Sequence, residues 1–305
     1  IVGCLNTIIP NSVTSIRRYA FYGCSGLTNI IIPNSVTSIG DSAFEGCTGL
    51  TSIEIPDSVV SIGSSAFYNC SGLTSIEIPD SVVSIGKSVF EGCNNITRMV
   101  LPFIGDNLNN PTEVYLGYFF GARDRFNNHF PSSLKSVQIT KKVFGGSLSG
   151  CSTLTNIEIS NGVESIERAA FSGCSGLTNI VIPESVRSIG NSAFKGCSGL
   201  ENITIPDSIA SIDSETFSSC SNLISVEIPS SVISVGDRAF ENCSALENIT
   251  IPDSVTRIDR NVFMGCTSLS SVIVDKNNTV YDSRNDCNAI IEKSSNQLLT
   301  GCLKT

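Results

Sequence analysis

The chain repeats one stretch of sequence, Ser42-Ala43-Phe44-Glu45-Gly46-Cys47-Thr48-Gly49-Leu50-Thr51-Ser52-Ile53-Glu54-Ile55-Pro56-Asp57-Ser58-Val59-Val60-Ser61-Ile62-Gly63, which recurs with small changes nine or ten times. Cysteines mark the period of this repeat. They recur at a constant interval at Cys24, Cys47, Cys70 and Cys93, and again at Cys151, Cys174, Cys197, Cys220, Cys243 and Cys266. A fixed period of about 23 residues is typical of a solenoid, in which each repeat forms one coil.

Each repeat predicts a coil with three sides. The run Leu50–Ile55 is rich in β-branched residues and ends at Pro56, because proline cannot donate to a strand ladder. Val59–Ile62 gives a second, shorter extended piece, and 64–67 reads as a single helical or 3₁₀ turn. One coil cannot bury its own apolar residues, so neighbouring coils must stack, about 4.8 Å apart. The predicted fold class is α/β by convention but rich in β structure, a solenoid of about 12 coils over residues 1–305.

The cysteine ladder has three interpretations. A structural zinc site needs converging ligands in close pairs, and this spacing supplies one cysteine per coil. A disulfide between stacked neighbours is disfavoured, because their Cβ atoms point in parallel rather than toward each other. We therefore expect a ladder of buried free cysteines that act as small core residues.

The composition argues against several classes of protein. The chain has 305 residues, of which 41% are hydrophobic, and can therefore bury a core. Its net charge is −9, whereas proteins that bind nucleic acid or anionic membranes usually carry a basic surface. A membrane-spanning helix needs about 18 or more consecutive apolar residues, and no apolar run in this sequence approaches that length. Direct membrane insertion is therefore not expected. The N-terminus, Ile1-Val2-Gly3-Cys4, shows no signal peptide.

The pattern Leu-x-x-Ile-x-Ile-Pro-x-Ser-Val-x-x-Ile-Gly-x-x-Ala-Phe-x-Gly-Cys resembles the BspA-like class of leucine-rich repeats. The resemblance covers most of the chain, with Leu73–Pro79 and Ser192–Cys197 as good instances. It implies a right-handed leucine-rich-repeat solenoid of the kind found on surface or secreted proteins of bacteria and some protozoan parasites, many of them adhesins. It names no ligand and brings no catalytic residue. We therefore expect an extracellular or cell-surface location, with any signal or anchor outside these residues.

The repeat breaks over residues 94–150. The interval from Cys93 to Cys151 exceeds two periods, and one coil carries about 15 extra residues. Eight of the 21 aromatic residues of the chain lie between Phe103 and Phe144. Insertions in solenoids form loops that often bind ligands, which makes this segment a candidate site. The alternative is that the aromatic side chains fold inward as a miniature core. The candidate binding residues are Tyr115, Tyr118, Phe119, Phe120, Arg123, Arg125 and His129.

A second candidate site is the outward face of the strands. By alternation Ser52 and Glu54 point out of the sheet, and repetition gives one small polar column and one column of acids, aliphatics and threonines. Stacked like charges attract a basic partner or a cation, whereas the alternative is a merely solvated face. The acids of this column are Glu54, Glu77, Glu158 and Glu227.

Residues 275–305 read as a terminal, hairpin-like variant repeat with its turn near residues 294–296. The last five residues match Gly3–Thr7, so the chain stops partway through a repeat. We therefore expect it to be an excised segment of a longer array, or a protein whose terminal caps were removed. Open coils at both ends predict end-to-end self-association.

Catalysis is not expected. His129 is the single histidine, so it is the only imidazole that could activate a serine or cysteine nucleophile. The sequence also has no calcium-binding loop and no phosphate-binding loop. We expect no cofactor and no metal. The sequence favours a non-catalytic extracellular binding module that adheres to a host or matrix protein or a glycan. The alternative is a structural spacer in a longer surface array.

Overall fold

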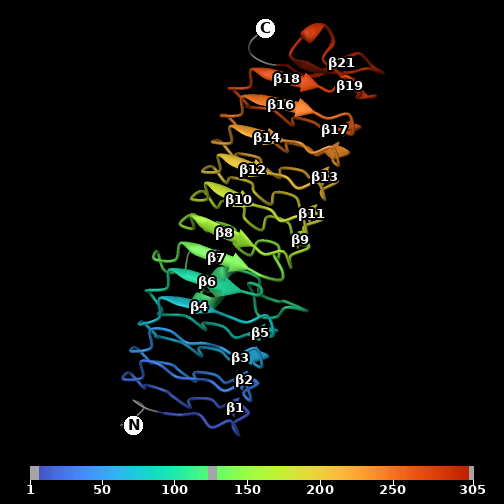
Figure 1. Cartoon of the computed structure of the whole chain (residues 1–305). Coiled ribbons are helices and arrows are strands. Elements are labelled where there is room, and N and C mark those ends of the chain that lie inside the picture. The colour runs from blue at the N-terminus through green and yellow to red at the C-terminus, as the bar shows by residue number, and fades with distance from the viewer. Residues whose placement is uncertain (1–6, 123–128, 302–305) are drawn as a thin grey trace. The chain divides into compact units, whose positions relative to one another are not determined.

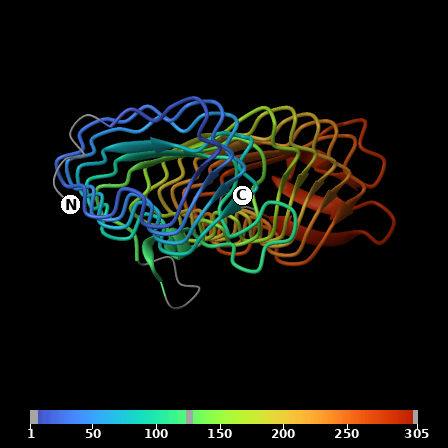
Figure 2. The ribbon, with the colours of Figure 1, turned by 90° about the horizontal axis from the view of Figure 1, so that it is seen from below.

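The computed structural model describes residues 7–122 and 129–301, which belong to two compact units, Ile1–Lys142 and Val143–Thr305. Both units are built from the same coil of about 23 residues, and the protein is a β-solenoid of about 11 turns with almost no helix. The leucine-rich-repeat solenoid predicted from the sequence is thereby confirmed, with about 11 coils rather than a dozen. Viewed from below in Figure 2, the coils within a unit trace superposed loops.

Each regular coil has a front strand, a rear strand and a turn. The front strand carries the Leu-x-x-Ile-x-Ile motif, the rear strand is a Ser-Ile pair or its equivalent, and the turn carries Ala-Phe-x-Gly-Cys. In Figure 1 the front strands of the second unit are stacked along one side and its rear strands along the other. All pairs within these two sets are parallel, and each residue pairs with its equivalent in the next repeat.

In the first unit the rear strands are β1 (Ser15–Ile16), β2 (Ser38–Ile39), β3 (Ser61–Ile62) and β5 (Ser84–Ile85). The front strands are β4 (Ser75–Glu77), β6 (Arg98–Leu101) and β7 (Ser136–Ile139), preceded by a single parallel bridge between Ile31 and Glu54. The irregular coil contains the 3₁₀ helix η1 (Leu116–Phe120).

In the second unit the front strands are β8 (Asn156–Ile159), β10 (Asn179–Val181), β12 (Asn202–Thr204), β14 (Ser225–Glu227), β16 (Asn248–Ile251) and β18 (Ser271–Val274). The rear strands are β9 (Ser165–Ile166), β11 (Ser188–Ile189), β13 (Ser211–Ile212), β15 (Ser234–Val235) and β17 (Arg257–Ile258). The last coil continues into β19 (Tyr281–Asp282), η2 (Arg284–Asp286), β20 (Ala289–Glu292) and β21 (Gln297–Gly301).

The turns differ from the helical or 3₁₀ turn predicted from the sequence. In a typical turn the residue two before the phenylalanine and the residue two after it both have positive φ, as for Ser42 (51°) and Gly46 (75°) around Phe44. Positive φ at the third position of a four-residue turn is the signature of a type II turn, so the segment is a succession of tight turns. Consecutive N–H groups then alternate between a local carbonyl and the next coil: Ala43 donates to Gly40, and Phe44 donates to Ala66.

Three backbone hydrogen bonds therefore join each regular turn to the next one along the chain. We call this set the turn ladder. Its donors are the two residues with positive φ and the phenylalanine between them, as in Ser192 to Ser214 (3.0 Å), Phe194 to Thr216 (2.9 Å) and Gly196 to Ser218 (2.8 Å). The same three bonds recur in both units. The turn ladder fixes the spacing at which side chains of successive coils meet in the core.

Phenylalanine rings are the largest fully buried side chains of that core. Within each unit neighbouring rings of the ladder lie 5.0–5.8 Å apart between centroids, from Phe21 to Phe90 and from Phe171 to Phe263. All of these pairs are stacked except Phe171 and Phe194, whose rings are tilted by 34°. Most of these rings are completely buried, as are the leucines that begin the front strands. Because a solenoid coil contacts only its neighbours, each ring depends on the coil on either side of it.

The cysteine ladder is largely as predicted. The ladder cysteines from Cys47 to Cys266 are free and buried, and most donate their thiol to the carbonyl 26 residues earlier, with sulfur-to-oxygen distances of 3.1–3.2 Å. One expectation was wrong: Cys24 is a disulfide cysteine and not a free thiol. Burial raises the pKa of Cys93 and of Cys197 to about 12, so these thiols stay protonated at neutral pH.

The hairpin expected near the C-terminus corresponds to β20 and β21, an antiparallel pair joined by a turn at 293–296. Asn278 completes the last regular coil, because its buried amide donates to the carbonyls of Pro252 (2.8 Å) and Val255 (2.9 Å). In earlier coils a serine hydroxyl makes the bond to this valine position, as Ser254 does to Val232. The Tyr281 hydroxyl accepts from the Ile258 N–H (2.9 Å) and so closes the rear ladder.

We predict that Phe194→Ala lowers the free energy of unfolding by about 3–5 kcal/mol, because it removes a fully buried ring between Phe171 and Phe217. Urea denaturation followed by circular dichroism measures this. The matched control is Thr204→Ala on the exposed front face of the same unit. Equal losses for the two variants would contradict the role given to the ring ladder.

We predict that a thiol reagent at pH 8 modifies Cys287 in the folded protein and leaves Cys93 and Cys197 unmodified. The ladder thiols are buried and almost wholly protonated at that pH, whereas Cys287 is partly accessible. Peptide mapping by mass spectrometry after alkylation measures the modified positions, and the same reaction in denaturant provides the reference. Labelling of Cys197 as fast as Cys287 in the folded state would contradict the burial described here.

Candidate functional site

The front face carries the two outward columns predicted from the sequence. In the second unit the pairing runs Asn179 to Asn202 to Ser225 to Asn248 to Ser271, which is the small polar column. The second column includes the pairs Val181 to Thr204 to Glu227 and Thr250 to Ile273. In the first unit Glu77 pairs with Val100, and Val100 pairs with Gln138. We call the second set the mixed column.

All four glutamates of the mixed column are exposed on the front face. They occur in two separate places. Glu54 and Glu77 stand one coil apart in the first unit, while Glu158 and Glu227 in the second unit have Val181 and Thr204 between them in the column. The Asn156 amide donates to the Glu158 carboxylate (2.8 Å), so the small polar column supports this acid. Glu54 and Glu77 thus form one short acidic patch, Glu158 and Glu227 stand singly, and the described residues form no continuous acidic stripe.

Aliphatic side chains of the mixed column are also exposed. Ile31 is 80% exposed and bridges to Glu54, Val181 is 77% exposed beside Thr204, and Ile273 is 53% exposed. Val100 is the exception, because it is buried although it belongs to the same column. Next to it the Arg98 guanidinium donates to the Gln138 amide oxygen (2.8 Å) across two front strands. The front face therefore presents large aliphatic groups beside carboxylates.

The inserted segment is closed by its own polar side chains. The Asp106 carboxylate accepts hydrogen bonds from the Thr112 and Glu113 N–H groups (2.8 and 3.1 Å) and from the Thr112 hydroxyl. Partial burial opposes ionisation of this carboxyl, but these hydrogen bonds outweigh it and lower its pKa. Leu108 donates to Val83 (2.9 Å), a bond that a regular coil also makes. The insertion is thus a loop added to an otherwise regular coil.

The aromatic residues of the insertion lie mostly in the core. Tyr115, Phe119 and Phe120 are buried, and the Phe119 and Phe120 rings pack on Phe90 at 6.3 and 6.4 Å between centroids. The backbone of η1 replaces a regular turn, since Phe90 donates to Phe119 (2.8 Å). These three rings therefore form the miniature core that the sequence left as an alternative to a binding site.

The remaining candidates of the insertion differ in exposure. Tyr118 is half-buried. Burial is the main cause that raises the pKa of its hydroxyl to about 12, and the negative charges of the nearby Asp106 and Glu113 add to it. His129 is exposed. Arg123 and Arg125 lie outside the described residues. The structure thus brings Tyr115, Tyr118, Phe119 and Phe120 together around η1 and places the four glutamates on the front strands.

An aromatic cluster on the first regular turn was not predicted from the sequence. Tyr19 and Tyr22 are about half exposed and meet edge to face at 5.4 Å, and the Arg18 guanidinium lies 4.5 Å from the centre of the Tyr19 ring. A signal was present, because Tyr19 stands where neighbouring repeats have serine. Tyr19 also has a φ of 62°, a conformation that bulky residues rarely adopt.

The described residues bring together no group of three or more metal-ligating side chains. Likewise, no helix within 7–122 and 129–301 has the length and apolar character needed to cross a bilayer. The surfaces that these residues form include an open strand face, an aromatic turn and a small pocket beside the C-terminal hairpin. They suit binding, and the leucine-rich-repeat solenoid is typically a non-catalytic fold.

Comparison with known proteins agrees with this geometry. The family model described as the BspA type leucine rich repeat region matches residues 4–112 and 137–270, in six copies. A leucine-rich repeat protein from Bacteroides ovatus is 30% identical, and the match covers 88% of this chain and 72% of that protein with a TM-score of 0.52. A leucine rich cell surface protein from Faecalibacterium prausnitzii is 28% identical over 86% of this chain and 83% of that one, with a TM-score of 0.40.

No curated protein sequence matches the chain. The repeat motif, the stacked coils and the family match agree with one another over most of its length. The chain belongs to the BspA-type leucine-rich-repeat family.

Proposed function

We propose that this chain is a non-catalytic extracellular binding module whose front face adheres to a host or matrix protein. The observation that carries the proposal is the exposure of large aliphatic side chains in the mixed column, with Ile31 80% and Val181 77% exposed. The same position holds glutamate or threonine in other coils, so the repeat does not require an aliphatic residue there. Exposed apolar groups beside polar ones are typical of interaction surfaces.

The chemistry of the face favours a protein ligand over a glycan. Sugar-binding surfaces draw on aromatic rings, and the front-strand residues of the described chain contribute none to the mixed column. Aliphatic groups beside carboxylates suit a protein surface that presents apolar and basic side chains. The open face of parallel strands also offers a broad contact area, because each coil adds two outward residues. Glycans are included as a second class of ligand in the binding test below.

An extracellular location is part of the same proposal. The family to which the chain belongs is typical of surface and secreted proteins. Free cysteines are compatible with an oxidising environment here, because the ladder thiols are buried and hold their protons, which slows oxidation. The alternative function, a structural spacer, predicts no ligand for the front face.

We predict that Ile31→Ser or Val181→Ser, depending on which unit a ligand contacts, weakens binding of a ligand recovered from a panel of matrix proteins and glycans by about 10- to 100-fold. This range corresponds to losing the burial of one aliphatic side chain, about 1.5–3 kcal/mol. Biolayer interferometry measures the change in Kd. The matched control is Val60→Ser, which removes an exposed valine next to the rear strand β3 and leaves affinity unchanged.

Each outcome decides between the functions. Loss with Ile31→Ser or Val181→Ser and not with Val60→Ser supports the front face. A ligand that responds only to Tyr118→Ala or His129→Ala moves the site to the insertion. If the wild-type protein binds nothing on the panel, the binding proposal fails and the spacer function is favoured.

A further inference from the structure

One turn of the solenoid lacks two restraints that the equivalent turns have. In most coils the front strand is followed by Pro-x-Ser-Val, a four-residue turn in which the valine N–H donates to the proline carbonyl, as Val36 does to Pro33 (3.0 Å). We call it the proline turn. After β8 its place is taken by Ser160-Asn161-Gly162-Val163, where the Val163 N–H donates to the Ser160 carbonyl at the same distance (3.0 Å). The turn is therefore retained, although its proline and its serine are both replaced.

The serine of the proline turn anchors it to the preceding coil. Its hydroxyl donates to a carbonyl there, as in Ser35 to Val13 (2.6 Å) and Ser185 to Val163 (2.7 Å). The equivalent bond is made by Ser58, Ser81, Ser208, Ser231 and Ser254. Gly162 has no hydroxyl group and cannot make this bond. The turn after β8 therefore lacks the side-chain anchor that these turns share.

Glycine is not required by the backbone of this turn. Gly162 does not adopt a positive φ, and serine occupies the same position in neighbouring coils. Glycine adds conformational freedom instead, because it has no Cβ. Proline fixes its own φ at about −65°, so a serine in its place removes a second restraint. The peptide that joins Asn161 to Gly162 is thus less restrained than its equivalents in the proline turns.

Asn161 and Gly162 form the single Asn-Gly pair of the 305-residue sequence. Both residues are exposed, and neither the Asn161 side chain nor the Gly162 N–H has a hydrogen-bond partner among the described residues. The amide carbon of Asn161 is therefore free to rotate toward the backbone nitrogen that follows it. Exposure also admits the water that a reaction between these two groups consumes.

We propose that the turn after β8 is a site of spontaneous deamidation at Asn161. Hydroxide removes the proton of the Gly162 N–H, and this nitrogen attacks Cγ of Asn161. A bond from the nitrogen to Cγ forms, the bond from Cγ to Nδ2 breaks, and the amide group takes a proton from water and leaves as ammonia. Water then adds to either carbonyl of the five-membered succinimide ring and opens it. The products carry aspartate or isoaspartate at position 161.

The reaction changes both the charge and the backbone of the turn. The equivalent positions of the next two coils hold Glu184 and Asp207, which are exposed, so a pair of acids becomes a row of three. Stacked strands lie about 4.8 Å apart, and like charges at neighbouring positions repel. The isoaspartate product also adds one methylene group to the main chain. The modification therefore loosens the connection between β8 and β9. It needs no ligand and is independent of the proposed binding function.

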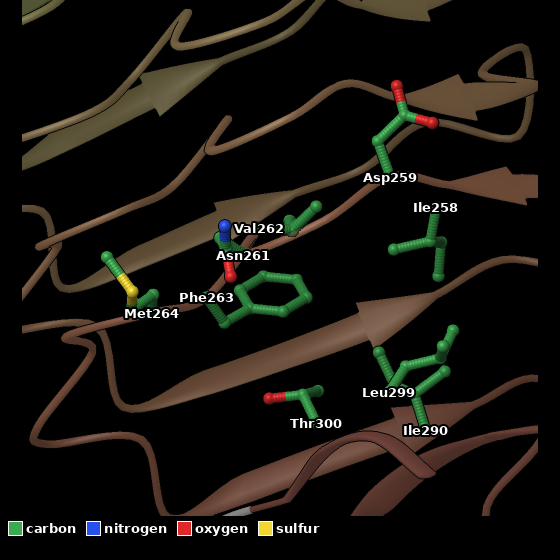
Figure 3. Close-up of a pocket in the computed structure, with 9 residues that line it drawn as sticks. All are labelled: Ile258, Asp259, Asn261, Val262, Phe263, Met264, Ile290, Leu299 and Thr300. Atoms are coloured by element: carbon green, nitrogen blue, oxygen red, sulfur yellow. The ribbon is translucent and has the colours of Figure 1, made fainter. Parts of the chain in front are cut away.

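Two other asparagines provide references within the same molecule. Asn34 occupies the same position of a proline turn and is exposed, but it precedes Ser35, which is anchored to the preceding coil. Asn261 is also exposed and lies beside Val262 at the pocket next to the C-terminal hairpin (Figure 3). The branched side chain of valine is stiff and hinders attack by its own backbone nitrogen. Exposure alone therefore does not make an asparagine reactive.

The test incubates the 305-residue chain at pH 8 and 37 °C and follows each asparagine by peptide mapping with mass spectrometry. Chromatography separates the aspartate and isoaspartate forms of each peptide, and circular dichroism shows that the protein stays folded. We expect Asn161 to convert about tenfold faster than Asn34 or Asn261, because of the three only Asn161 precedes a residue without a Cβ. Equal conversion of Asn161 and Asn34 in the folded protein overturns the proposal.

Two reciprocal variants make the comparison decisive. Gly162→Ser restores the residue found in neighbouring coils, so it keeps the fold and lowers the conversion of Asn161 about tenfold, to the level of Asn34. Ser35→Gly removes the anchor from the reference turn and raises the conversion of Asn34 severalfold, although Pro33 still restrains that turn. Conversion of Asn161 at the wild-type rate in Gly162→Ser, or an unchanged rate for Asn34 in Ser35→Gly, overturns the proposal.

Discussion

The turn ladder is the constraint on which the rest of this structure depends. Its three hydrogen bonds per coil require an N–H group on every second residue to point toward the next coil, and the chain achieves this with two residues of positive φ around each phenylalanine. A right-handed helical turn at this place would bond these groups within its own coil. The left-handed residues therefore convert a local turn into a connection between coils.

The side-chain ladders follow from that connection. With the coils held at a constant spacing, each phenylalanine stacks on its predecessor, and most ladder thiols reach a carbonyl of the previous coil at 3.1–3.2 Å. A serine hydroxyl repeats the same device behind the front strand, as in Ser185 to Val163 (2.7 Å). These polar groups are small and each has a partner, so the core accepts them without leaving a buried donor unsatisfied. The cysteine of the motif thus acts as a compact donor as well as an apolar residue.

The sequence was sufficient to predict what depends on period and alternation. The coil, the two strands, the outward columns and the burial of the cysteine ladder all follow from the constant repeat spacing and from the alternation of side chains along a strand. The conformation of the turn did not follow, because Ser42 and Ser65 carry no signal for positive φ and their N–H groups bond to the next coil. Whether the aromatic residues of the insertion are buried could not be predicted either, because it depends on contacts between residues far apart in the sequence. Phe119 and Phe120 are buried where η1 packs on Phe90.

The candidate surfaces show the same division. The exposure of Glu54 and Glu77 follows from strand alternation, whereas the burial of Val100 in the same column does not. Tyr19 and Tyr22 belong neither to a repeating outward column nor to the insertion, because they stand in a turn of ordinary length. A binding surface in a repeat protein can lie where the side chains of one coil depart from those of the others. Cys24 illustrates the same point in the core, where one member of a uniform ladder is a disulfide cysteine.

The turn ladder also governs how such a chain can change in length. Every regular coil offers its neighbours the same donors and the same acceptors, so a gene that gains or loses one whole period leaves each remaining junction intact. An insertion that is not a whole period cannot form a further coil and must form a loop between two intact coils, as the segment around Asp106 and Thr112 does. Duplication or deletion of a single coil therefore preserves the hydrogen bonds at every remaining junction, and this architecture can vary its length without redesigning its core.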